Sequence, residues 1–460
     1  MAERNLHDNG ILHPTGRRNR PGFKAAAQTG ARRMKVSIQV LGSLGDVMPY
    51  ISAAIALKAR GADVSILAPV DYTPMIEAAG LKADRTANFR LAEWMERAAE
   101  KGTLSNPAAF FRDWAEMIAP HVDDTMDRAL EAARGADIVV ANLICAPARI
   151  AAEAEGTAFL LTAQQPVLSP TREHPCAMIW WPWMGQHANR ASYRMVWLAQ
   201  RLIGIPLGRH RRRLGLPQRP AFSDMRTHLS QPLRKVTTVP PALMSTRPSD
   251  WTELDLLAPY PSLATPAGAA LSSALEQFLS AGPAPVYVGL GSLSDAHGAA
   301  VTAAALEALG RLGLRGIFPA SLAKHQDVAA QGHFVCGHEP HDLLFPRCAA
   351  VIHHGGAGTV DSALRAGAVQ IVQPHMLDQF WFTASLERIG VGGRPLASDR
   401  LEAGDVIKAL EAAQAPARKE AARRVREASA GLDGAGALAD IILDEAARFS
   451  SAGGRAARHR

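Results

Sequence analysis

Short strands that end in a glycine turn and run into a helix recur along this chain, and no other feature restricts its fold as strongly. Residues 36–41 are a β-rich run followed by Gly42 and Gly45, and apolar periodicity predicts a helix over residues 49–60. The same alternation returns from residue 138 and again from residue 285. Repeated β-α-β units require parallel strands with helices on both faces. The chain is therefore predicted to be an α/β protein with two doubly wound sheets.

Domain boundaries follow from where this alternation stops. With 460 residues the chain exceeds what one hydrophobic core supports, and a stretch rich in Pro, Ala, Leu and Ser separates the two α/β series. The predicted parts are a disordered basic tail at 1–33, an N-terminal domain at 34–258, a linker at 259–272, a C-terminal domain at 273–430, a helix at 431–449 and a basic tail at 450–460.

Charge, hydropathy and cysteine spacing exclude several classes of protein. The formal net charge of +7 resides in the two tails, so the core is close to neutral and nucleic-acid binding is not expected. No apolar run reaches the ~18 residues that a membrane-spanning helix needs, and no signal peptide is recognisable, which favours a cytoplasmic protein. The four cysteines lack CxxC spacing, so neither a disulfide framework nor a zinc ribbon is expected.

The strongest local signal is an apolar strand that ends in two histidines and a run of small residues. His353 and His354 are followed by Gly-Gly-Ala-Gly, and a helix is predicted from Thr359. Such a turn presents free backbone N–H groups and the positive end of a helix, which suits a diphosphate. The alternative interpretation is a tight turn whose histidines only pack. No Gly-Lys-Thr/Ser sequence is present at this turn, so an ATP site of the Walker type is not supported.

Four motifs in fixed order resemble those of a known enzyme family. Residues 353–359 (HHGGAGT) and 374–379 (PHMLDQ) resemble the donor signature of family 1 glycosyltransferases with the GT-B fold. Residues 42–47 (GSLGDV) resemble a motif of the bacterial antibiotic and sterol members, and residues 289–292 (GLGS) a phosphate loop. The resemblance covers about residues 34–430 and implies two Rossmann-like domains that face a cleft.

The resemblance also implies a donor, an acceptor and their binding residues. The expected donor is a UDP- or dTDP-sugar used without cofactor or metal, and the expected acceptor is a small hydrophobic molecule with a hydroxyl. The helix at 431–449 is expected to return to the N-terminal domain. The assigned residues are His354, Gly356, Gly358, Thr359 and Ser292 for the diphosphate, Asp378 and Gln379 for the sugar, and Glu339, Pro340 and His341 for the base.

The same signature departs from the family pattern at three positions. Leu377 replaces the glycine that usually precedes the Asp-Gln pair, Val369 replaces a usual proline, and His375 stands where an aromatic residue is common. These changes leave the phosphate motif intact and leave the identity of the sugar open.

Asp46 is the predicted general base. It follows the first strand, where an acceptor hydroxyl would meet the anomeric carbon of the sugar, and an aspartate can accept the proton as the new C–O bond forms. In-line attack would then invert the anomeric configuration. The alternative interpretation is that Asp46 caps the following helix, since aspartate is favoured at that position.

Other candidate residues have simpler explanations beside the functional one. Trp180, Trp181 and Trp183 could form an acceptor platform, although such a cluster is as often core or lid. The histidines near residues 338–354 lack the helical spacing of metal ligands, so no metal site is predicted. The basic run at 211–213 is expected to be a solvated helix face, with transient contact to a membrane surface as the alternative.

Two other functions share the fold class. Sugar-nucleotide 2-epimerases pair two such domains, but their acidic and basic cluster near the sugar has no convincing equivalent in this sequence. A non-catalytic GT-B helper protein is the other alternative, and the intact histidine and Asp-Gln pair speak against it. Inverting hexose transfer is therefore the predicted reaction.

Overall fold

The computed structural model describes residues 32–86, 112, 116, 119–179, 185–218, 226–266, 268–291, 294–324, 326–397 and 400–453. The chain divides into two compact units. Unit 1 takes in the described residues up to Leu263 except Arg112, together with those from Asp433 onward. Unit 2 takes in the described residues from Ala264 to Leu432. Most of the two predicted basic tails lies outside the described residues.

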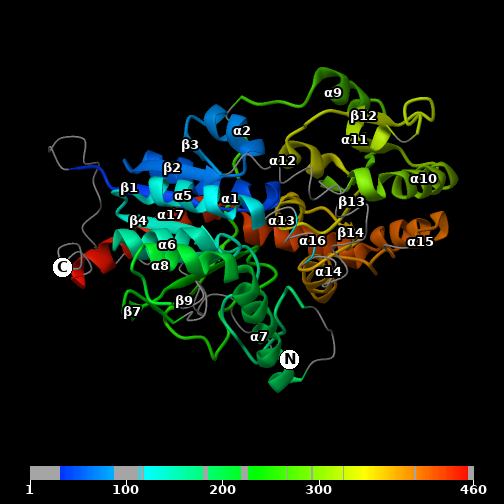
Figure 1. Ribbon diagram of the computed structural model, residues 1–460. Helices are drawn as coiled ribbons and strands as arrows, with labels where there is room; N and C mark the ends of the chain where they lie inside the picture. Colours follow the sequence, from blue (N-terminus) through cyan, green and yellow to red (C-terminus); the bar gives the residue numbers. More distant parts are fainter. Residues whose placement is uncertain are drawn as a thin grey trace. The chain divides into compact units, whose positions relative to one another are not determined.

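Unit 1 is built on a seven-stranded sheet with all neighbours parallel (Figure 1). Its order is β3-β2-β1-β4-β5-β8-β9, so the direction of winding reverses between β1 and β4. The strands are β1 Lys35–Gln39, β2 Asp63–Ala68, β3 Lys82–Arg85, β4 Ile138–Asn142, β5 Ala158–Ala163, β8 Lys235–Val239 and β9 Asp255–Pro259. A separate two-stranded antiparallel sheet joins β6 Thr227–His228 to β7 Gln231–Pro232.

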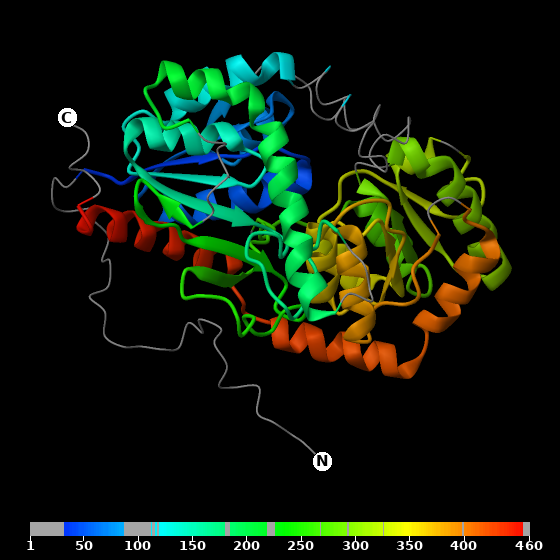
Figure 2. The same ribbon diagram turned by 60° about the horizontal axis from the view of Figure 1, so that its bottom comes forward.

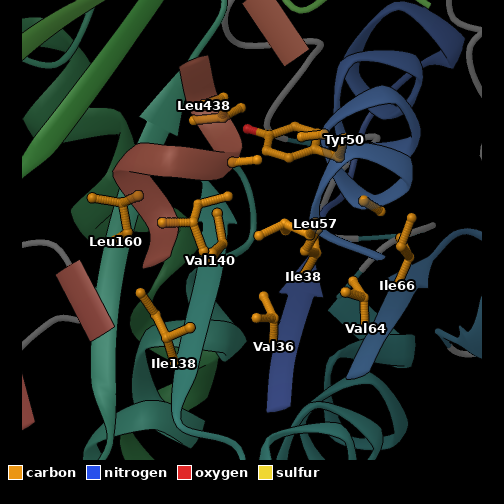
Figure 3. Packing of buried hydrophobic residues seen from close by; sticks show 14 of the residues in the cluster. Val36, Ile38, Tyr50, Leu57, Val64, Ile66, Ile138, Val140, Leu160 and Leu438 are labelled. Atoms are coloured by element: carbon orange, nitrogen blue, oxygen red, sulfur yellow. The ribbon is translucent and has the colours of Figure 1, made fainter. Parts of the chain in front are cut away.

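Helices cover both faces of this sheet, as alternating strands and helices require. They are α1 Leu44–Ala59, α2 Thr73–Ala78, α5 Val122–Ala133, α6 Ala146–Glu155, α7 Gln186–Ile203, α8 Gly208–Arg213 and α17 Gly434–Ser451, with short 3-10 turns η1 Val70–Tyr72, η4 Ala119–His121 and η5 Ile205–Leu207. Figure 3 shows side chains of the core, in which Ile38 and Val140 of the central strands pack with Leu57 of α1 and Leu438 of α17.

The last helix belongs to unit 1 although the chain reaches it from unit 2. Helix α17, red in Figure 2, packs against α1, β4, β5 and β9. Arg60, the C-cap residue of α1, donates from Nε to Asp440 at 2.7 Å, and Arg234 forms an ion pair with Asp444 at 2.7 Å. Gly434 begins the helix so close to Tyr260 that an added Cβ would lie 2.1 Å from the Tyr260 carbonyl oxygen. Only glycine fits this approach without a backbone shift.

Unit 2 contains a five-stranded parallel sheet of order β12-β11-β10-β13-β14. Its strands are β10 Val286–Gly289, β11 Gly316–Pro319, β12 Phe334–Cys336, β13 Ala350–His353 and β14 Gln370–Val372. Its helices are α9 Ser273–Ser280, α10 Ser294–Leu312, α11 Ala320–Ala323, α12 His341–Leu344, α13 Ala357–Ala366, α14 Gln379–Arg388, α15 Ala403–Ala413 and α16 Pro416–Ser429, with a 3-10 turn η7 Phe345–Arg347. In such doubly wound sheets, ligands bind where the winding reverses, which here is between β10 and β13.

The predicted architecture of two doubly wound α/β domains is confirmed. The helix predicted over residues 49–60 was placed too late, because it begins at Leu44 with Ser43 as its N-cap. Apolar periodicity finds the buried part of a helix, whereas its first turn is specified by the cap. Among the described residues, no helix is long and apolar enough to cross a membrane.

Candidate functional site

The turns after β10 and β13 lie against each other at the reversal point of unit 2. Gly289 and His353 are partners in the register of these two strands. The ring of His354 lies between Gly291 and Gly356: an added Cβ would approach His354 Cε1 to 2.9 Å from Gly291 and His354 Nε2 to 2.5 Å from Gly356. The two glycines therefore leave the space that the imidazole occupies.

The paired histidines have different surroundings. His353 is fully buried, and its Nε2 lies 2.9 Å from Gln370 Oε1 while its Nδ1 accepts the N–H of Gly355 at 3.0 Å. These bonds require a proton on Nε2 and none on Nδ1. Burial, with the nearby His354 as a smaller cause, lowers the pKa of His353 to about 3. His353 is thus neutral at pH 7 and holds the backbone of the turn.

The ring of His354, unlike that of His353, is not held by hydrogen bonds to the described residues. Its Nδ1 is buried, and no hydrogen bond joins it to any residue of the described chain. Burial lowers the pKa of His354 to about 4, so its imidazole is neutral at pH 7 in the free protein. A neutral imidazole can donate one N–H to a phosphate oxygen but brings no fixed positive charge.

The turn that joins β13 to α13 depends on a left-handed glycine. Gly355 has φ +92°, a region that residues with a side chain rarely adopt. An added Cβ there would also lie 2.9 Å from Val372 Cγ1 and 3.4 Å from the Cβ of Gln379. The predicted sugar-binding end of α14 is therefore beside the predicted phosphate turn.

The N-terminus of α13 lacks a side-chain cap. Its N-cap is Gly356, and its first turn contains no acidic residue. Other helices, among them α5, α6 and α15, also lack a side-chain cap, whereas Asp433 caps α17 by accepting the N–H of Gly436 at 2.8 Å. The first N–H groups of any helix have no acceptor within it, so an anion can take the place of a cap. Gly358 and Thr359 contribute N–H groups to this first turn.

The Asp-Gln pair begins α14, with Asp378 as N-cap and Gln379 as the first helical residue. Gln379 is buried, and its Oε1 accepts the N–H groups of His375 at 2.7 Å and Met376 at 3.2 Å. Its amide oxygen therefore shapes the loop, whereas no hydrogen bond joins its amide NH₂ group to any described residue. Leu377 has φ +48°, a left-handed conformation that glycine adopts without strain and that residues with a side chain rarely adopt.

The predicted base-binding segment follows β12. Glu339 Oε2 accepts the N–H of Ser272 at 3.1 Å, and Pro340 precedes α12 as its N-cap. The ring of His341 stacks on Phe345 with centroids 4.3 Å apart. Burial lowers the pKa of His341 to about 4, so this ring is neutral and can stack on a base.

Asp46 lies in the first turn of α1 in unit 1, next to the point where that sheet reverses. Its Oδ2 accepts the N–H of Ser43 at 2.8 Å and the Ser43 hydroxyl at 3.0 Å. Asp46 is therefore not the N-cap that the alternative interpretation predicted: Ser43 is the N-cap, and Asp46 is the third helical residue, whose carboxylate accepts the N–H of the N-cap as in a capping box. Burial raises the pKa of Asp46, although the Ser43 bonds oppose that shift. A raised pKa makes the carboxylate a better proton acceptor, so capping and general-base roles are compatible.

Asn142 at the end of β4 fixes the turn that carries Asp46. It donates from Nδ2 to the Leu41 carbonyl at 2.5 Å, and its Oδ1 accepts the N–H of Cys145 at 3.2 Å. Gly42, at φ +129°, completes the turn, and an added Cβ would meet Asp46 Oδ2 at 2.4 Å. Asn142 was not among the predicted site residues, and its only signal in the sequence is its place at the end of a neighbouring strand.

Several predicted residues fall outside the described chain. They are Ser292, Trp180, Trp181 and Trp183. Within the residues that the structure describes, no group of three or more His, Cys, Asp or Glu side chains is arranged to hold a metal ion.

The proteins to which this chain is similar in sequence include glycosyltransferases. Residues 326–433 match the family model of the erythromycin biosynthesis protein CIII-like C-terminal domain. Over 431 residues the chain is 32% identical to glycosyltransferase GtfE of Amycolatopsis orientalis, covering 89% of this chain and 97% of GtfE. It is 31% identical to vancomycin aglycone glucosyltransferase of the same organism, covering 90% and 98%.

Solved structures agree on the fold. The chain is similar to glycosyltransferase VinC in complex with dTDP, with a TM-score of 0.62 and 18% identity, covering 90% of this chain and all of VinC. This likeness shows the GT-B fold.

Proposed function

This chain belongs to the glycosyltransferase family of GtfE and vancomycin aglycone glucosyltransferase, and we propose a specific reaction for it. A hexose passes from a UDP- or dTDP-sugar to a hydroxyl of a small, largely apolar acceptor, with inversion at the anomeric carbon. Nothing in the comparisons supports the 2-epimerase or helper alternatives. A cytoplasmic location stays a prediction.

One observation carries the donor assignment: α13 begins without a side-chain cap, beside a histidine whose buried Nδ1 has no hydrogen bond to the described residues. We assign the diphosphate to His354, to the backbone N–H groups near Gly356 and Gly358, and to the backbone N–H and side-chain hydroxyl of Thr359. Ser292 is proposed to assist from the β10 turn. These donors stabilise a leaving diphosphate, which supports a reaction that needs no bound metal or cofactor.

The remaining donor contacts follow the same signature. Asp378 and the amide NH₂ group of Gln379 are proposed to bind hydroxyls of the transferred sugar. The base is proposed to lie on Glu339, Pro340 and the neutral ring of His341. The dTDP complex of VinC supports a nucleoside diphosphate as the common part of the donor, with the choice between UDP and dTDP open to titration.

The proposed chemistry is a single displacement. The acceptor oxygen attacks the anomeric carbon, the bond from that carbon to the diphosphate oxygen breaks, and the diphosphate departs with the electron pair. Asp46 accepts the hydroxyl proton as the new bond forms. The attack comes from the face opposite the leaving group, so the anomeric configuration inverts.

The acceptor is the least specified part of the proposal. The name of one relative gives its acceptor as the vancomycin aglycone, which supports a natural product as the acceptor class here. Trp180, Trp181 and Trp183 are proposed as an acceptor platform.

Isothermal titration with UDP, dTDP and their sugars tests the donor site without needing the acceptor. His354→Ala and Thr359→Ala should weaken nucleoside diphosphate binding by about 1.5–3 kcal/mol, or roughly 10- to 150-fold, for a lost hydrogen bond to a charged group. His187→Ala on the exposed start of α7 is the matched control and should bind as wild type. Unchanged affinity in both site variants would refute the diphosphate assignment.

A further inference from the structure

An unusually basic segment forms part of the surface of unit 1. Residues 185–218, which include α7 and α8, hold seven arginines and no Asp or Glu. Three of them are neutralised by neighbouring helices: Arg209 pairs with Asp123, Arg211 with Glu153 and Arg213 with Asp127. The other four are exposed, and no ion pair joins them to any described residue: Arg190, Arg194, Arg201 and Arg212.

Apolar side chains project from the same segment. Ile205, Met195 and Leu198 are 69%, 60% and 58% exposed, the largest values among the exposed large hydrophobic residues of the described chain. Arg194, Leu198 and Arg201 are spaced by four and three residues, so they share one side of α7. We use the name α7 face for Arg190, Arg194, Met195, Leu198 and Arg201 of α7 together with Ile205 of the 3-10 turn η5 that follows it.

The opposite side of α7 is fixed to its own unit. Ser192 Oγ accepts the N–H of Cys176 at 2.8 Å, and Asn189 Nδ2 donates to the Arg172 carbonyl at 2.9 Å. Tyr193 is fully buried on this side and lies 3.2 Å from His174 Nδ1. These contacts place the α7 face on the side of the helix opposite the loop that supports it.

We propose that the α7 face docks on a membrane surface that contains anionic lipids. Apolar side chains of an amphipathic helix gain free energy by entering the boundary between headgroups and acyl chains, and arginines beside them attract lipid phosphates. The phosphates of a nucleic acid would pair with the arginines, but they would not bury the apolar side chains of Met195, Leu198 and Ile205. Because the α7 face combines exposed arginines with exposed apolar side chains, an anionic lipid surface fits it better than a nucleic acid does. Docking is independent of sugar transfer and would hold for the protein without donor or acceptor.

Vesicle co-sedimentation of the full chain tests this proposal. The lipids are pure phosphatidylcholine and phosphatidylcholine mixed with phosphatidylglycerol, at low and physiological salt. The protein should partition onto the anionic vesicles and less so at higher salt. Arg194→Gln/Arg201→Gln should lower the partition coefficient about fivefold per arginine, or roughly 25-fold for the pair. Met195→Ser/Leu198→Ser should also lower it, because the apolar anchors are lost.

Lys408→Gln/Arg424→Gln is the matched control, since it removes two exposed charges from α15 and α16 of unit 2. It should partition like wild type. All variants keep both basic tails, so unchanged partitioning of the two α7 pairs would place lipid binding in the tails and overturn the proposal. Equal loss in the control, or no preference for anionic vesicles, would overturn it as well. Thermal midpoints and dTDP titration confirm that each variant is folded.

Discussion

Replacing His353 with alanine tests whether the two histidines of the phosphate turn have different roles, one in stability and one in binding. The wild-type imidazole is fully buried and bonds both Gln370 and the N–H of Gly355. Alanine leaves these two buried polar groups without their partner, at about 1–3 kcal/mol each. The expected loss in the free energy of unfolding of unit 2 is therefore about 2–6 kcal/mol, before any cost of the cavity.

His354→Ala should behave in the opposite way. No hydrogen bond joins the buried Nδ1 of His354 to the described chain, so its loss strands no partner. We expect the free energy of unfolding to change by less than about 1 kcal/mol, which is below the cost of one stranded group. Binding of nucleoside diphosphate should weaken in this variant.

Chemical denaturation combined with hydrogen exchange of the amides in β13, α13 and β14 gives the stability of unit 2 separately from unit 1. His353→Asn is a partial rescue, because its side-chain oxygen can still accept the Gly355 N–H while the bond to Gln370 is lost. The reasoning is refuted if His353→Ala is as stable as wild type, or if His354→Ala is the less stable of the two.

Four further predictions test other parts of the molecule. Asp46→Asn should keep donor affinity but lower kcat by about 10²–10⁴-fold, and normal turnover would leave Asp46 as a cap only. Turnover should survive EDTA, whereas loss with recovery on added Mg²⁺ or Mn²⁺ would contradict the metal-free mechanism. Burial holds the pKa values of His341, His353 and His354 at about 4, 3 and 4, below their ordinary 6.5. The unfolded chain therefore binds more protons below pH 6.5, and stability should fall from there toward pH 4 by up to about 1.4 kcal/mol per pH unit for each histidine. His353→Ala should show a shallower fall, and an unchanged slope in denaturation measured across pH would count against the assigned burial. Gly434→Ala should destabilise unit 1 by about 1–3 kcal/mol through the clash with Tyr260, while Gly404→Ala, with open space around it, should not.

The sequence alone determined the fold class and the position of the phosphate turn. Both depend on local requirements of the backbone. A strand that leads into a helix through Gly355 and Gly356 is recognisable because only glycine tolerates the left-handed conformation and the close approach of the histidine ring. Apolar periodicity identified the strands and the buried part of α1 for the same reason, since period and burial are linked along the chain.

Tertiary structure alone decided what each side chain does. His353 and His354 are adjacent in sequence, yet Gln370, 17 residues after His353, accepts a hydrogen bond from His353 and not from His354. The turn that carries Asp46 is fixed by Asn142, which lies 101 residues after Leu41 in the sequence and donates a hydrogen bond to the Leu41 carbonyl. The loop at residues 172–176 likewise decides which side of α7 is exposed, because it forms hydrogen bonds with the opposite side of the helix. Partners and burial are set by segments that meet only on folding, so no local pattern contains them.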